Sequence, residues 1–126
     1  MRRPFVHCAD LVLEAGSDSN APGGAVTLAL CGSWDHAGAC RWPHITSAGV
    51  DERRIALRVV FVADEEEEKR VRTLIGEAVA GGECAGPDGV ISKWSVTGSS
   101  AGVLSASEES LGAELVEKSA GNSGVG

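Results

Sequence analysis

Six cysteine and histidine side chains are concentrated in the first 44 residues of this 126-residue chain. The whole sequence contains four cysteines and three histidines, and Cys84 alone lies outside that region. Thiolates and imidazoles are the ligands that zinc and softer ions such as copper(I) prefer. The concentration therefore predicts a metal site. Its candidate ligands are Cys31, His36, Cys40, His44, Cys8 and His7.

Four of these residues follow one another in the pattern Cys-x4-His-x3-Cys-x3-His, which runs from Cys31 to His44. We expect this quartet to bind the ion, with Cys8 and then His7 as the nearest substitutes. Zinc is the expected cofactor, and copper or iron are the alternatives. The spacing lacks the Cys-x2-Cys pairs of common zinc motifs, so ordinary buried cysteines and loop histidines stay open as an alternative.

Three classes of function fit these residues. The first is a small zinc-binding domain, in which four protein ligands close the coordination sphere. The second is a metal-dependent enzyme of hydrolase or lyase type, with three ligands, one bound water and Asp35 as a candidate base or orienting residue. The third is a metal-free module that binds another protein. We expect a metal ion as partner in the first two classes, and a protein partner or a homodimer in the third.

The segments before and around the cysteine and histidine residues are predicted to form strands and a loop. Residues 5–15 and 25–34 are rich in aliphatic and β-branched side chains, and the segment between them is dense in turn formers. The pattern predicts an N-terminal β-hairpin that places His7 and Cys8 near Cys31. Residues 32–54 show no sustained period and are predicted to form a long loop.

The second half of the chain reads as strand, helix, strand. Residues 55–63 form a near-continuous apolar run, and residues 90–98 alternate. Between them, Asp64 is predicted to cap a helix together with Glu67, in a capping box. That helix carries an apolar stripe, and its two flanking strands are expected to run parallel. The stripe consists of Val71, Leu74, Ile75, Ala78 and Val79.

Together these elements predict an α+β fold with a mixed sheet of about four strands and one amphipathic helix on one face. We expect a single domain over residues 1–103. Residues 104–126 are expected to form a weak C-terminal helix, over about 108–118, or a flexible tail. The second sheet face lacks an evident cover, which favours a homodimer through that face.

Composition excludes several classes of function. The 18 acidic side chains outnumber the 11 basic ones, and the net charge of −7 disfavours nucleic acid or an anionic membrane as partner. No apolar stretch reaches the length of a membrane span, and acidic residues interrupt any export signal, so we expect a cytoplasmic location with reduced thiols. The sequence contains neither a phosphate-binding glycine motif nor a nucleophile elbow.

Overall fold

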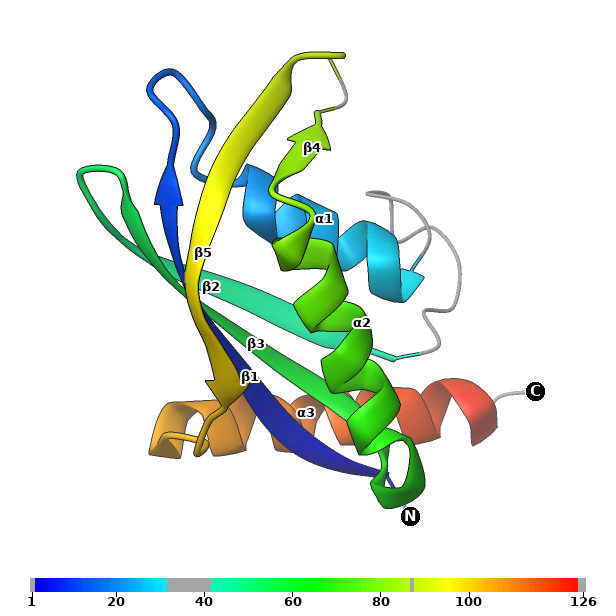
Figure 1. Ribbon diagram of the computed structural model, residues 1–126. Coiled ribbons are helices and arrows are strands. Elements are labelled where there is room, and N and C mark those ends of the chain that lie inside the picture. The colour runs from blue at the N-terminus through cyan, green and yellow to red at the C-terminus, as the bar shows by residue number, and fades with distance from the viewer. Residues whose placement is uncertain (1, 32–41, 87, 125–126) are drawn as a thin grey trace.

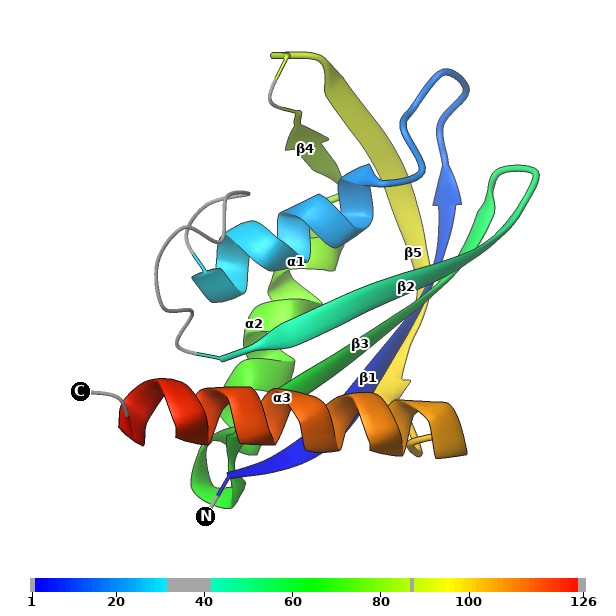
Figure 2. The ribbon, with the colours of Figure 1, turned by 180° about the vertical axis from the view of Figure 1, so that it is seen from behind.

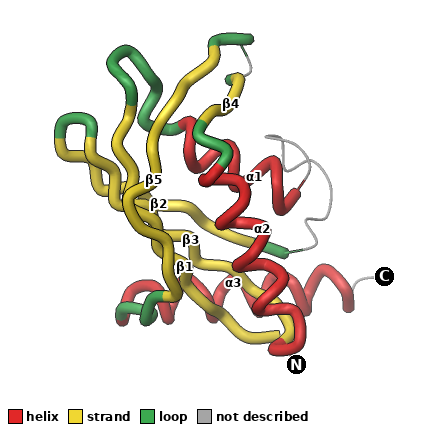
Figure 3. The backbone as a smooth tube through the Cα atoms, in the orientation of Figure 1, coloured by secondary structure: helices red, strands yellow, loops and turns green. Residues whose placement is uncertain are grey.

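The computed structural model describes residues 2–31, 42–86 and 88–124. Five strands and three α-helices make up this part of the chain, and the fold is therefore α+β (Figures 1 and 3). The strands are β1 (Arg2–Leu13), β2 (His44–Asp51), β3 (Arg54–Asp64), β4 (Glu83–Ala85) and β5 (Ile91–Ala101). The helices are α1 (Ala21–Cys31), α2 (Glu68–Ala80) and α3 (Ala106–Gly124), with a 3-10 turn, η1 (Glu65–Glu67), before α2.

The strands form one antiparallel sheet in the order β2-β3-β1-β5-β4. Helix α1 connects β1 to β2, and α2 leads from β3 toward β5, so each helix joins two strands that have a third strand between them. This is a pair of interleaved split β–α–β units. The prediction of a mixed sheet is wrong, because β3 and β5 run in the same direction but are separated by β1, which is antiparallel to both.

The helices lie on two different faces of the curled sheet. Helices α1 and α2 cover one face, and α3 crosses the opposite face, as the two views from front and back show (Figures 1 and 2). We call these the α1/α2 face and the α3 face. The main core lies on the α1/α2 face, where Phe61 and Leu11 meet the buried stripe Val71, Ile75 and Val79 of α2. No described helix is long and apolar enough to cross a membrane.

The predicted N-terminal hairpin is wrong, because most of the segment 25–34 belongs to α1. Pro22 occupies the first turn of that helix, where its missing N–H costs nothing. Val26 and Leu30 are buried and lie four residues apart, which places both on the side that faces the sheet. Packing of this face outweighs the strand preference of the β-branched residues, and β1 pairs with β3 instead.

The predicted long loop 32–54 is also wrong in its second half, which contains β2. Residues His44–Asp51 pair with β3 in a regular antiparallel register without a bulge. The strands predicted at 55–63 and 90–98 correspond to β3 and β5, and the predicted amphipathic helix is α2. Asp64 does not form the expected capping box, since its side chain makes no hydrogen bond to the helix start.

A capping box is present at the start of α3 instead. Glu108 N donates to Ser105 Oγ over 3.2 Å, and Ser105 N donates to Glu108 Oε1 over 2.9 Å. The same carboxylate receives two hydrogen bonds from Arg58 of β3, each 2.7 Å long, from Nε and Nη2. Gly112, one turn further, lies so close to Pro4 of β1 that a Cβ would overlap it. The Arg58 fork and this close approach fix α3 on the sheet.

We expect Glu108→Gln to lower the free energy of unfolding by about 1 to 2 kcal/mol, since it weakens a charge-assisted pair that is partly exposed. Arg58 lowers the pKa of Glu108 from 4.5 to about 2. The contribution is therefore complete above about pH 4.5 and is lost as the pH falls toward 2. Urea unfolding across this range, with the exposed Glu109→Gln as control, measures both effects. Equal stability of the two variants at neutral pH would contradict this role of Glu108.

The β2–β3 hairpin turn contains a strained residue. Glu52 has a φ of 57°, in the left-handed region that is unfavourable for side chains with a Cβ. We expect Glu52→Gly to raise the free energy of unfolding by about 0.5 to 1 kcal/mol, whereas Glu52→Ala should give no gain. Thermal unfolding of the two variants compares them directly, and an equal gain for both would show that φ is not the cause.

Candidate functional site

Strand β2 forms one outer edge of the sheet. In its antiparallel pairing with β3, Val62 N donates to the carbonyl oxygen of Pro43, which sets the phase of the ladder. Residues of β2 with odd numbers therefore face β3 with their main-chain groups, and those with even numbers face outward. No hydrogen bond within residues 2–31, 42–86 and 88–124 uses the outward main-chain groups of Thr46, Ala48 and Val50. These groups are available to an added strand.

Natural sheets blunt exposed edges with short strands, bulges, prolines or lysines. The opposite side of the sheet follows this rule, because β4 has only three residues and β5 contains a bulge at Thr97, which lacks a partner between two paired neighbours. Strand β2 has eight residues, an unbroken register, and no lysine or proline. Its side chains Ile45 and Val50 are 37% and 52% exposed. The β2 edge is thus long, regular and unprotected in the described part of the molecule.

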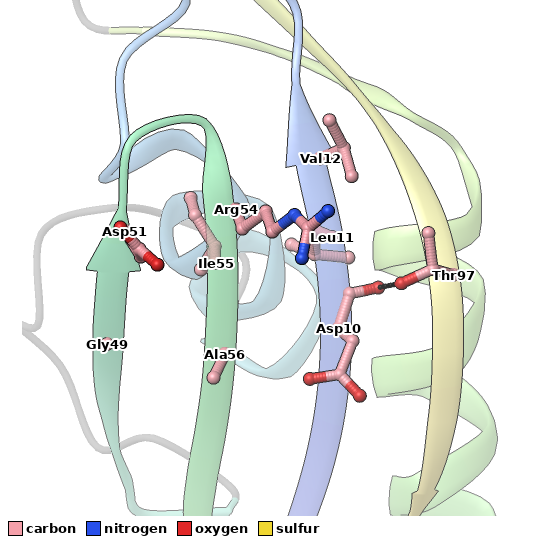
Figure 4. A pocket seen from close by; sticks show the side chains of 9 residues that line it. All are labelled: Asp10, Leu11, Val12, Gly49, Asp51, Arg54, Ile55, Ala56 and Thr97. Carbon is pink, nitrogen blue, oxygen red and sulfur yellow. Dashed lines mark hydrogen bonds between the residues drawn. The ribbon is translucent and has the colours of Figure 1, made fainter.

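A shallow trough runs across the α3 face from this edge. The register places Gly49 of β2 beside Ala56 of β3, Ala56 beside Asp10 of β1, and Asp10 beside Gly98 of β5. These four residues form one transverse row, and three of them carry no side chain or only a methyl group. Three members of the row, Gly49, Ala56 and Asp10, line a pocket of about 420 Å³ that is open to solvent (Figure 4).

Three charged side chains surround the row. Asp51 and Arg54 occupy the next row toward the hairpin turn, directly opposite each other on β2 and β3. The Arg54 side chain extends from β3 toward β1 (Figure 4). The carboxylate of Asp10 has no hydrogen bond or ion pair to any described residue, while its carbonyl oxygen accepts a hydrogen bond from Thr97 Oγ1 over 3.1 Å. Two carboxylates and one guanidinium leave the trough with one surplus negative charge.

The lining offers carboxylate, guanidinium and main-chain groups. Neither cysteine nor histidine lines the pocket, so its described lining offers no thiol nucleophile and no imidazole base. The small floor residues leave room above the sheet, and the exposed main chain of β2 offers hydrogen bonds at the entrance. The arrangement suits an extended chain and a side chain that it carries.

The structure separates the residues that were expected to bind a metal. His7 and Cys8 are neighbours on β1 and face opposite sides of the sheet, and Cys31 is the last residue of α1. His44 is buried at the start of β2, where its Nδ1 contacts the carbonyl oxygen of Trp42 and its Nε2 contacts Thr27 Oγ1. His36, Cys40 and Asp35 lie outside the described residues.

The prediction of a zinc-binding domain is wrong. Residues 2–31, 42–86 and 88–124 contain no group of three or more His, Cys, Asp or Glu side chains that could hold a metal ion. The approach of the substitutes His7 and Cys8 to Cys31 was also expected, and it depended on the N-terminal hairpin, which is not formed. The same finding removes the support for a metal-dependent enzyme.

His7 belongs to a polar cluster at the other end of the sheet. Its Nε2 lies 2.9 Å from Ser99 Oγ, and its Nδ1 lies 3.3 Å from Nη1 of Arg72, which also binds Glu68. A serine beside a histidine suggests a nucleophile and a base. However, a guanidinium can only donate, so Nδ1 accepts and Nε2 carries the proton. His7 then donates to Ser99 and cannot remove its proton, which excludes this pair as a nucleophile–base pair.

Comparison of the chain with protein-family models, with curated proteins and with solved structures found no match. The candidate site therefore rests on geometry alone. None of the trough residues is among the metal ligands predicted from the sequence. Nothing in the local sequence around Gly49, Ala56 and Gly98 marks them as parts of one site, because only the strand register brings them together.

Burial and the nearby Arg72 lower the pKa of His7 below its usual 6.5. The unfolded chain therefore binds this proton more readily, and we expect the stability of the fold to decline as the pH falls below about 6.5. His7→Gln should flatten this dependence. Urea unfolding of both proteins between about pH 5 and 7.5 tests it, and identical slopes would show that His7 does not titrate in the expected direction.

Proposed function

We propose that the protein is an interaction module that binds an extended segment of a protein partner along the free edge of β2. The observation that carries this proposal is the unprotected outer edge of β2, with the outward main-chain groups of Thr46, Ala48 and Val50. An added strand would satisfy these groups and continue the sheet. Each such hydrogen bond contributes about 0.5 to 1.5 kcal/mol, so a short segment can bind with modest affinity.

Two further features support an added strand. Ile45 and Val50 are exposed and lie on opposite faces of β2, so each face of the edge offers an apolar contact to the incoming side chains. The β2–β3 hairpin is tied by regular pairing over its whole length, so the template is rigid before the partner arrives. This function corresponds to the third class considered from the sequence, a metal-free module that binds another protein.

The first test uses random peptides displayed on phage, selected against the whole protein. We expect selected peptides to lose binding to Ala48→Pro, because proline removes an outward N–H and leaves the β2–β3 hydrogen bonds intact. In the free protein, the amides of Thr46, Ala48 and Val50 should exchange with solvent faster than those of Ile45, Ser47 and Gly49. Bound peptide should slow the first group.

A matched pair of lysine variants provides the control. Val50 and Val90 are 52% and 59% exposed, but only Val50 lies on the β2 edge. Val50→Lys should weaken peptide binding and Val90→Lys should not. If no peptide binds the unmodified protein, or if binding tolerates Ala48→Pro, the proposed function is wrong. Circular dichroism of each variant verifies that the fold is retained.

A further inference from the structure

We infer that the trough formed by Gly49, Ala56 and Asp10 selects partners with a basic side chain, arginine or lysine, at one position of the bound segment. This inference rests on the proposed function and adds the chemical class of the ligand. The added strand supplies the main-chain contacts, which are insensitive to sequence, and the trough supplies the discrimination.

The geometry of the sheet links the edge to Asp10. Gly49 exchanges hydrogen bonds with Ala56, so an incoming antiparallel residue opposite Gly49 occupies a non-hydrogen-bonded position, where side chains approach most closely. Its side chain lies on the α3 face. Gly49 and Ala56 leave the space above β2 and β3 open, and any larger residue at either position would block it.

The length of the trough determines which side chains of the bound segment can approach Asp10. Three strand spacings separate the main chain of an added strand from β1, a distance of about 14 Å. Asp10 lies at the β1 end of this distance. Only a long side chain laid along the floor covers the rest, and arginine and lysine combine that length with an apolar stem that fits a floor of Gly49 and Ala56.

The charges favour a cation at the end of this side chain. The carboxylates of Asp10 and Asp51 outnumber the single guanidinium of Arg54 in the lining, and the carboxylate of Asp10 has no hydrogen bond or ion pair in the described part of the chain. A basic group at Asp10 brings the trough to neutrality. The net charge of −7 on the whole chain further attracts basic segments.

The test compares sequences and affinities of the phage-selected peptides. We expect arginine or lysine to be enriched at one position. A peptide with that residue should bind Asp10→Asn about fivefold more weakly than the unmodified protein, as for an exposed ion pair, while the same peptide with alanine there should bind both equally. Raising the salt concentration should weaken the first complex more than the Asp10→Asn complex.

Two control variants separate the trough from general charge. Glu66→Gln removes one negative charge from the η1 turn, far from the trough in sequence and on a different element, and should not change the affinity. Ala56→Leu should remove the preference for a basic residue by filling the floor, and should retain binding of the alanine peptide at the β2 edge.

The outcomes distinguish this inference from the proposed function. If selected peptides bind the edge without a basic preference, or if Asp10→Asn and Glu66→Gln have equal effects, the trough does not select and the interaction module stands. If no peptide binds at all, the proposed function itself fails. A basic preference that Ala56→Leu leaves intact would place the recognition elsewhere and overturn the inference.

Discussion

The antiparallel pairing of β1 with β3 is the constraint on which the rest of the structure depends. It runs without interruption from the pair Arg2 and Asp64 to the pair Val12 and Arg54, in the centre of the sheet. Because alternate side chains face opposite sides, this single register decides which residues enter the core and which face α3. A shift of β1 by one residue would exchange the faces of His7 and Cys8, bury Asp10 and expose Leu11.

The same register divides the α3 face into two halves. At one end, the buried residues Val6, Val60 and Val62 need a cover, and α3 provides it. The boundary lies at Arg58, whose fork on Glu108 brings a charge to the middle of the sheet and fixes the helix start there. Beyond it the side chains of the trough are small or polar with the exception of Val12, so leaving this half open to water costs little. The open half contains the trough.

The elements that local patterns define were predictable, and those that depend on distant partners were not. The stripe of α2 and the apolar run of β3 carry their own periodicity, so both were placed correctly. Segment 25–34 carries aliphatic residues that suit a strand or a buried helix equally, and in its described part, residues 25–31, burial of Val26 and Leu30 against the sheet favours the helix. Pairing of β1 with β3 spans more than forty intervening residues and leaves no local signal. The capping box Ser105–Glu108 was readable, since serine followed by glutamate three residues later is its usual pattern.

The candidate site lies at the β2 edge and the trough, and not at the cysteine and histidine residues that the sequence predicted as metal ligands. Candidate metal ligands can be recognised in a sequence by residue type, and the concentration of cysteine and histidine was the most unusual feature of the sequence. An edge strand is recognised by main-chain N–H and C=O groups that lack a hydrogen-bond partner. Every residue type carries these groups, so the sequence does not identify them. The trough likewise depends on the small size of the residues that form its floor, Gly49 and Ala56. In the proposed mode of recognition, main-chain hydrogen bonds supply the affinity, and the space above the small floor residues supplies the selectivity. Both depend on the strand register, which local sequence patterns do not reveal.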